Sequence, residues 1–307
     1  MRAAVQAPAL DDAPMTGPAR VHGARLAGRG LSRFLRDPAG LLALMLFLAV
    51  AGAAVFAPAI ASHDPLEQDL NRRLLAPALQ VGGDWTFPLG TDQLGRDILS
   101  RIIYAARVSL SISLLATVLS GAFGIAVGLI AGLHEGWLGD LVLRLTDVQL
   151  AFPFLMLAIA IVTAAGPSYT ALVITLAIWG WVPFARIARA EVISIKHRDF
   201  IAAANSVGAR PPRVLLRHVL PNAMPPLIVI WTFSFAQMVI TESSLSYLGM
   251  GIQPPTPSWG NMLTDGRDVV GIAWWLATFP GLAIMGTVLA INVLGDMLRE
   301  VLDPHLS

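Results

Sequence analysis

The chain has 307 residues, of which 55% are hydrophobic and only 13% are charged, and its formal net charge is +1. Because an ordinary soluble domain carries roughly 25% charged residues, this composition indicates an integral membrane protein and excludes a wholly disordered chain. The low net charge offers no bulk polycation for nucleic acid. The absence of cysteine excludes a disulfide framework, a thiolate zinc site and a catalytic thiol.

The first predicted span follows a long N-terminal tail. Residues 1–39 are rich in Ala, Pro, Gly and Arg and are predicted to be cytoplasmic, and residues 40–60 form the first transmembrane helix. A basic flank before an apolar run is also typical of a signal peptide, but a cleaved hydrophobic region usually has only ~7–15 residues close to the N-terminus. The run from Leu41 to Ile60 is longer and starts later, which favours an uncleaved span.

Residues 61–107 are predicted to form an extracytoplasmic loop that ends in an interfacial helix from Asp97 to Arg107. The loop holds turn residues followed by a compact group of acids and bases. Such a group can be a ligand or catalytic constellation, but it is more typical of a structural ion-pair network. The residues singled out are Gly90, Thr91, Asp92, Gly95, Arg96 and Asp97.

Residues 108–299 are predicted to hold five further spans. Charge-free runs cover Val108–Leu133, Val148–Ala185, Val219–Thr241 and Val269–Gly295, and the second of them is divided by turn residues at Gly166–Tyr169. Six spans place both termini on one side, and the distribution of Arg and Lys predicts that this side is the cytoplasm. Residues 300–307 then form a cytoplasmic C-terminal tail. The predicted fold is an all-α integral membrane protein with six transmembrane helices.

The largest predicted cytoplasmic loop covers residues 186–222. Asp199–Val207 reads as a short helix, Gly208 supplies a turn, and Pro211 and Pro212 begin a second helix that Pro221 is predicted to end. A hairpin tethered to two spans can serve as a docking lever for another protein. It can equally be a connector that packs beneath its own bundle, and the residues alone leave both readings open.

The second outer loop closes the fifth span with Glu242, the one ionisable group there that is flagged as a candidate functional residue. The simpler reading is an acid at the membrane interface that reaches water. Three prolines stiffen the following segment, and Trp259 can anchor it at the interface. The residues singled out are Glu242, Gln253, Pro254, Pro255, Trp259 and Gly260.

The sequence offers no catalytic machinery and no metal site. Lys196 is the only lysine and follows no glycine-rich loop, so any ATP used must be bound by another chain. The six histidines are scattered and fit neither a triad nor a metal site. A stand-alone secondary transporter or channel remains the alternative, although the charge-free runs lack the acids and histidines that ion coupling normally uses.

Phe200–Asn222, FIAAANSVGARPPRVLLRHVLPN, resembles the EAA loop of ABC importer permeases, which in that family docks into a groove on the ATPase subunit. Ala202 stands where the family usually has Glu, a departure that concerns an ion pair with the ATPase and not the docking itself. The positions that match the pattern are Ala203, Ala204, Gly208, His218, Leu220, Pro221 and Asn222.

Three further segments resemble the C-type permease of the dipeptide, oligopeptide and nickel subfamily of ABC importers. They are PLGTDQLGRDILSRIIYAARVSL, ESSLSYLGMGIQPPTPSWGNMLTDGRD and WWLATFPGLAIMGTVLAINVLGDMLREVLDPHL. The resemblance implies a type I permease core in the bacterial inner membrane that pairs with a second, different permease, two ABC ATPase subunits and an extracytoplasmic substrate-binding protein. It implies no cofactor on this chain, with ATP and Mg held by the ATPases. It leaves the cargo open among dipeptides, longer peptides, glutathione and nickel chelates.

Overall fold

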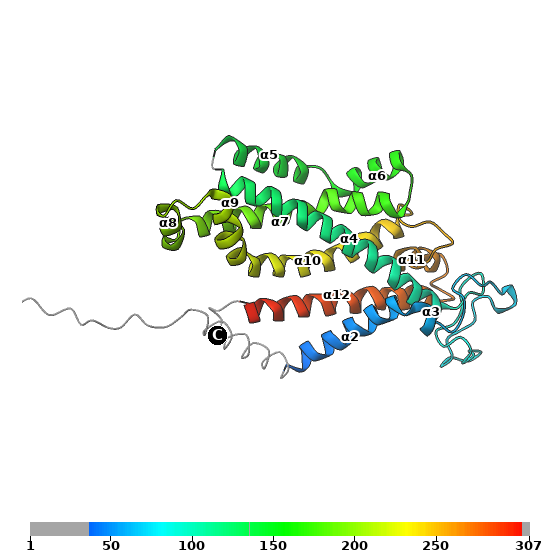
Figure 1. The fold of residues 1–307 in the computed structure, drawn as a ribbon. Helices are drawn as coiled ribbons and strands as arrows, with labels where there is room; N and C mark the ends of the chain where they lie inside the picture. Colours follow the sequence, from blue (N-terminus) through cyan, green and yellow to red (C-terminus); the bar gives the residue numbers. More distant parts are fainter. Residues whose placement is uncertain (1–36, 135, 303–307) are drawn as a thin grey trace, which may run out of the picture.

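The computed structural model describes residues 37–134 and 136–302, which form a bundle of long helices (Figure 1). The five longest are α2 (Pro38–Val55), α4 (Ile98–Leu133), α7 (Tyr169–Lys196), α10 (Leu220–Tyr247) and α12 (Trp275–Leu302). Within these ranges the one isolated β-bridge joins Thr91 to Asp97. The all-α prediction is confirmed. The tails predicted for residues 1–39 and 300–307 lie largely outside the described residues.

The third predicted span is a pair of helices rather than one. α5 (Trp137–Ala151) and α6 (Phe154–Ala165) meet at an angle of 87° across a two-residue break that contains Pro153. Within residues 37–134 and 136–302, five single helices are long and apolar enough to cross a membrane, and a sixth crossing results if this bent pair counts as one. The turn predicted at Gly166–Tyr169 separates α6 from α7, as expected.

Several helix boundaries differ from those predicted, two of them at α4 and α12. The segment expected as a separate interfacial helix is the first part of α4, which runs unbroken for 36 residues. The final helix begins at Trp275 instead of Val269, because the described residues just before it form turns. Short helices α3 (Ala57–Ile60), η1 (Leu70–Arg72) and α11 (Trp259–Arg267) lie in or beside the loops.

The closest helix crossing in the bundle joins α4 to α7 through a row of glycines on α4. A Cβ added to Gly124 would lie 2.8 Å from Phe184 Cβ, and one added to Gly128 would lie 2.7 Å from Ala188 Cβ. Small residues let two membrane helices approach until their backbones touch, which gains dispersion energy that larger side chains would prevent. These glycines therefore fix the separation of α4 and α7.

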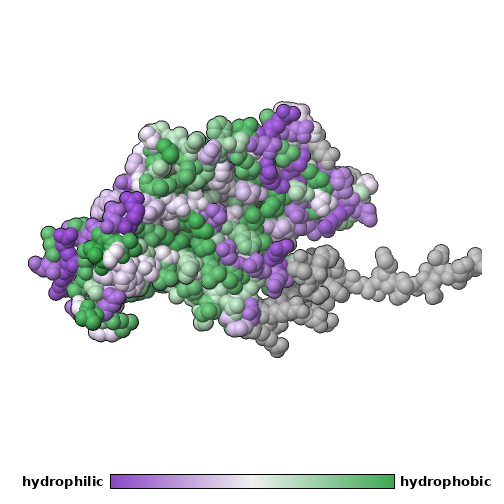
Figure 2. Space-filling model, turned by 180° about the vertical axis from the view of Figure 1, so that it is seen from behind, coloured by the Kyte–Doolittle hydropathy of each residue, from purple (hydrophilic) through white to green (hydrophobic). Residues whose placement is uncertain are grey.

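The connecting segments gather at the two ends of the bundle. The hairpin of α8 (Asp199–Ser206) and α9 (Pro211–Val214) lies at one end, and the loop that contains α3 and η1 lies at the other (Figure 1). Hydrophobic side chains dominate the middle of the molecule, whereas hydrophilic ones gather toward the ends (Figure 2). This distribution suits a protein whose helices cross a bilayer.

Candidate functional site

The α8–α9 hairpin turns at Gly208, whose φ of +76° lies in the left-handed region that favours glycine. The N–H of Ala209 donates to the carbonyl of Ala204 at 3.1 Å and closes the end of α8. The predicted helix, glycine turn and second helix therefore lie in the order expected. α9 continues into the π-helical turn η2 (Leu215–Val219) and then into α10.

One side of the α8–α9 hairpin packs against the end of α7. Ile201, Val214 and Val219 are at most 5% exposed, and they belong to one apolar cluster with Val192 and Ile195 of α7. A rigid-body displacement of the hairpin would therefore displace the end of α7 with it, because separating the two would expose this cluster to water.

The opposite side of the hairpin is open. Val207 is 85% exposed and Phe200 40% exposed, while Ala202 and Ala203 are exposed and Ala204 is half-buried. The result is a small apolar surface, made of short side chains, on a segment that joins two spanning helices. It can accept the backbone of another protein at close range.

Pro221 does not end the second helix of the hairpin, contrary to the sequence prediction. A proline lacks an N–H and leaves an earlier carbonyl without its helical donor. Here the π turn shifts the bonding register, with the Leu220 N–H donating to Leu215 O, and the side-chain amide of Asn222 donates to His218 O at 2.6 Å. His218 and Leu220 are half-buried, whereas Pro221 and Asn222 are exposed.

The acids and bases before α4 form a buried ion-pair network. Asp92 is 1% exposed and pairs with Arg101 and with Arg96, whose Nε lies 2.6 Å from Asp92 Oδ2. Asp265 of α11 lies 3.3 Å from Arg101 and 3.6 Å from Arg96. This geometry supports the structural reading of the cluster, and Asp265 is the partner that the sequence did not point to.

Backbone geometry explains the other residues of this motif. Gly90 and Gly95 have φ of +81° and +74°, and a Cβ on either would run into the backbone of the preceding loop. The carbonyl of Thr91 accepts from Trp275 Nε1 at 3.1 Å, and its hydroxyl accepts from Leu75 N–H at 2.9 Å. The motif thus ties the outer loop to α12.

The outer loop after α10 is held by the capping residues at the start of α11. Ser258 and Asn261 form a reciprocal capping box at the start of α11, and Trp259 is 1% exposed with its Nε1 donating to Ile102 O at 3.2 Å. Trp259 is therefore a core residue and not an interface anchor. Gln253 donates to the carbonyls of Gly249 and Gly251, a cis peptide bond joins Pro254 to Pro255, and Gly260 packs against Ser243.

Glu242 is 0% exposed, so it does not reach water as the simpler reading supposed. It lies within α10, because that helix continues to Tyr247 instead of ending at Thr241. Ser246 Oγ donates to Glu242 Oε1 at 2.7 Å, and Ser243 Oγ lies 3.4 Å from Oε2. These hydroxyls satisfy the carboxyl group inside the bundle.

The sequence reasoning missed a polar face on α10. Gln237, Thr241 and Ser244 share one side of the helix at a spacing of four and three residues, and Gln237 and Ser244 are exposed. By contrast, the large exposed side chains of α2, α4 and α12 include Leu48, Leu119 and Leu289, and they suit contact with lipid. The helical spacing of the three polar residues was the available signal.

These features define a multi-pass membrane protein with an open hairpin at one end and a polar face on one spanning helix. Residues 124–307 match the family model described as "Binding-protein-dependent transport system inner membrane component", and residues 26–77 match the "N-terminal TM domain of oligopeptide transport permease C". The chain belongs to this family of inner-membrane permeases, and the resemblance seen in its sequence is confirmed.

Relatives match over most of their length. The chain is 43% identical over 299 residues to the di/tripeptide transport system permease protein DppC of Pseudomonas aeruginosa, covering 97% of this chain and 98% of the relative. It is 41% identical over 274 residues to the dipeptide transport system permease protein DppC of Escherichia coli K12, covering 89% and 91%. The dipeptide permease DppC of Haemophilus influenzae is 40% identical over 274 residues, with 89% and 93% covered.

Proposed function

We propose that this chain is one permease subunit of an ATP-driven importer of dipeptides or short oligopeptides. It pairs with a second, different permease, two ABC ATPase subunits and an extracytoplasmic substrate-binding protein. The chain itself is not an enzyme, because ATP and Mg are bound by the ATPases. The names of the relatives and the family membership support this assignment.

The observation that carries the proposal is the two-sided hairpin. Its inner side is fixed to α7 by Ile201 and Val214, it continues directly into α10, and its outer side is apolar and open. An ATPase that binds the outer side and moves on nucleotide binding would displace the ends of two spanning helices together. A conformational equilibrium shifts only by the difference in binding free energy between its states, and the ATPase supplies that difference.

The hairpin end faces the cytoplasm in this proposal. Gly40, near the start of α2, lies against Met297 near the end of α12, which supports both termini emerging on one side. The loop that contains α3 and η1, at the far end of the bundle, then faces outward and receives the binding protein.

The polar face of α10 lines half of the substrate path in this proposal. Thr241 Oγ1 and Ser244 Oγ donate to carbonyls of their own helix at 2.7 and 2.8 Å, so both hydroxyls keep a hydrogen bond whether they face lipid or water. The Gln237 amide has only one long bond, at 3.4 Å to Thr241 Oγ1, and would be costly against lipid. An uncharged amide that donates and accepts suits a peptide backbone with varied side chains.

Coupling is tested at the glycine turn. Gly208→Val places a β-branched residue at a left-handed φ, whereas Gly208→Asn is the matched control because Asn tolerates that region. We expect the valine variant to lose ATP-driven uptake of a labelled dipeptide in proteoliposomes holding the co-purified complex, and the asparagine variant to retain it. Uptake by this chain without ATPases, or full activity with Gly208→Val, contradicts the proposal.

The path is tested by thiol labelling, since the chain has no cysteine of its own. A charged, membrane-impermeant thiosulfonate needs water and a thiolate, so Gln237→Cys should react in the assembled complex. Leu119→Cys, at a site that is 50% exposed on α4, is the lipid-facing control and should not react. Equal labelling of both positions, or labelling of Leu119→Cys alone, contradicts the assignment of the path.

A further inference from the structure

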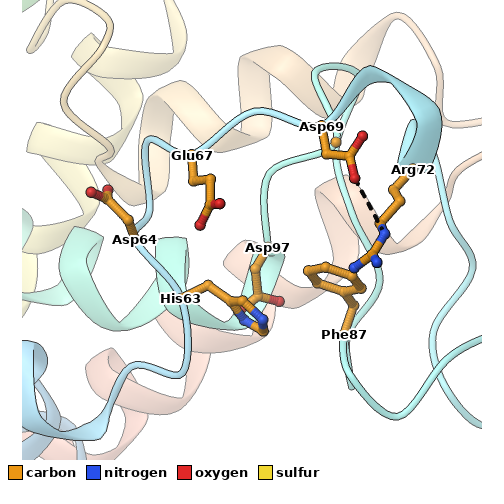
Figure 3. A pocket seen from close by; sticks show the side chains of 8 residues that line it. His63, Asp64, Glu67, Asp69, Arg72, Phe87 and Asp97 are labelled. Atoms are coloured by element: carbon orange, nitrogen blue, oxygen red, sulfur yellow. Dashed lines mark ion pairs between the residues drawn. The ribbon is translucent and has the colours of Figure 1, made fainter.

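A pocket of about 80 Å³ lies in the loop at the end of the bundle opposite the hairpin (Figure 3). In the proposed function, on which this inference rests, this end of the bundle receives the binding protein. The lining includes four carboxylates, one imidazole and one aromatic ring: Asp64, Glu67, Asp69, Asp97, His63 and Phe87.

The pocket has an excess of negative charge. Arg72 is the lining residue with a permanent positive charge, and its Nε pairs with Asp69 at 3.3 Å while its guanidinium lies over Phe87 at 5.3 Å. Among the described residues, neither Asp64 nor Glu67 has a basic partner. Four carboxylates against one guanidinium give the pocket a negative potential, which favours the entry of a cation.

Asp97 supplies an independent sign that a donor belongs there. This residue is only 2% exposed, and its Oδ2 accepts from Ser100 N–H at 3.0 Å and Ser100 Oγ at 2.6 Å. Its Oδ1 is buried without any hydrogen-bond partner. Leaving a buried carboxylate oxygen without a donor is unfavourable, so an unmade bond of this kind usually marks a missing donor.

His63 stands beside Asp97 and also lacks a bond. Its Nδ1 lies 3.5 Å from Asp97 Oδ2 and is buried without a hydrogen-bond partner. The ring is held by stacking on Phe87, with centroids 4.8 Å apart, and its backbone N–H donates to Ser100 Oγ at 3.1 Å. The His63 ring is therefore held in place beside the Asp97 carboxylate at the pocket wall.

The geometry narrows the class of ligand. Across the described residues no three His, Asp or Glu side chains are placed to hold one metal ion, which disfavours a divalent cation. The remaining ligand that carries both positive charge and N–H donors is an ammonium or guanidinium group. We propose that this pocket receives a basic side chain, Lys or Arg, of the substrate-binding protein when it docks.

Glu67 is the residue on which to test this. It lies in the loop, and its backbone N–H donates to Asp64 O at 3.2 Å, but no hydrogen bond or ion pair among the described residues uses its side chain, so its replacement should leave the fold intact. Glu67→Gln raises the net charge by one inside the pocket. Gln80→Lys raises it by one at an exposed position of the same loop outside the pocket, and is therefore the matched control.

The measurement is the affinity of the purified binding protein for the permease–ATPase complex in nanodiscs, at two ionic strengths. We expect Glu67→Gln to weaken binding about 5- to 20-fold and Glu67→Lys to weaken it further, with Gln80→Lys within about twofold of the wild type. A Lys→Glu or Arg→Glu variant of the binding protein should restore binding to Glu67→Lys.

Two outcomes overturn the pocket and leave the proposed function standing. In one, Glu67→Gln binds as tightly as the wild type. In the other, Gln80→Lys weakens binding as much as Glu67→Gln, which would assign the effect to long-range charge. If no binding protein associates with the wild-type complex, the proposed function fails and the pocket assignment fails with it. Melting curves of the variants, expected to be unchanged, exclude misfolding.

Discussion

The crossing of α4 and α7 makes the glycine at position 128 sensitive to a single methyl group. In Gly128→Ala the new Cβ would lie 2.7 Å from Ala188 Cβ and closer still to the Ala185 carbonyl, whereas ordinary van der Waals contact begins at 3.4 Å. Neither neighbour can rotate away, because one is backbone and the other is a Cβ. The two helices must therefore separate by several tenths of an ångström along the crossing.

Overpacking of this kind typically costs about 1–3 kcal/mol. We therefore expect the melting temperature of the purified protein in detergent to fall by roughly 2–10 °C, measured by size-exclusion chromatography after heating. The matched control is Gly52→Ala on α2, where nothing lies within 4 Å of the added Cβ. There the change should be neutral or slightly stabilising, because Ala is a better helix former. Equal melting of the two variants would refute the idea that α4 and α7 meet through glycine.

Three further pairs of substitutions test the end of the bundle opposite the hairpin by the same melting assay. Asp92→Asn breaks the buried network and should cost about 3–5 kcal/mol, whereas Asp268→Asn, which removes an exposed pair, should change the melting temperature little. Similar losses for the two variants would argue against burial of the network. Gly95 and Gly82 both have positive φ, but only Gly95 packs against Asp69, so Gly95→Ala should lower the stability more than Gly82→Ala. An equal loss of stability would assign the effect to φ alone. Glu242→Ala should destabilise the protein by about 2–4 kcal/mol, since it leaves a cavity and removes the acceptor of the serine hydroxyls. The isosteric Glu242→Gln should retain most of the stability. The reverse order would contradict the hydrogen-bonding role of Glu242.

Much of this architecture could be predicted from the sequence because charge-free runs of spanning length are a direct signal of membrane helices. The hairpin could be predicted as well, since Gly208 and the two prolines after it specify a turn and a helix start. The predictions that failed were helix boundaries at which a residue distant in the sequence overrides the local sequence preference. Arg101 indicated a helix at the interface, yet Asp92 and Asp265 neutralise it and α4 continues through it.

Pro221 and Gln237 show two other limits. Proline is a strong stop signal, but the helix continues past Pro221 through a π turn, which cannot be inferred from the proline alone. Gln237 sits in an apolar run and changes the hydropathy little. Its place in a polar face is visible only when the exposed faces of all the long helices are compared, which requires the packed structure. The orphaned oxygen of Asp97 is invisible to sequence for the same reason.

The continuity of α9, η2 and α10 has a mechanical consequence. Together they make one helical rod of 36 residues from Pro212 to Tyr247, about 54 Å long at ~1.5 Å per residue. Such a rod transmits tilt from one membrane surface to the other with little loss, so a tilt imposed at its hairpin end would reach Glu242 and the start of α11. The π turn and the prolines Pro221, Pro225 and Pro226 interrupt the regular α-helical hydrogen bonding near its base. Because most of α10 is stiff and its base is more compliant, a small movement at the base would open or close the opposite end of the bundle.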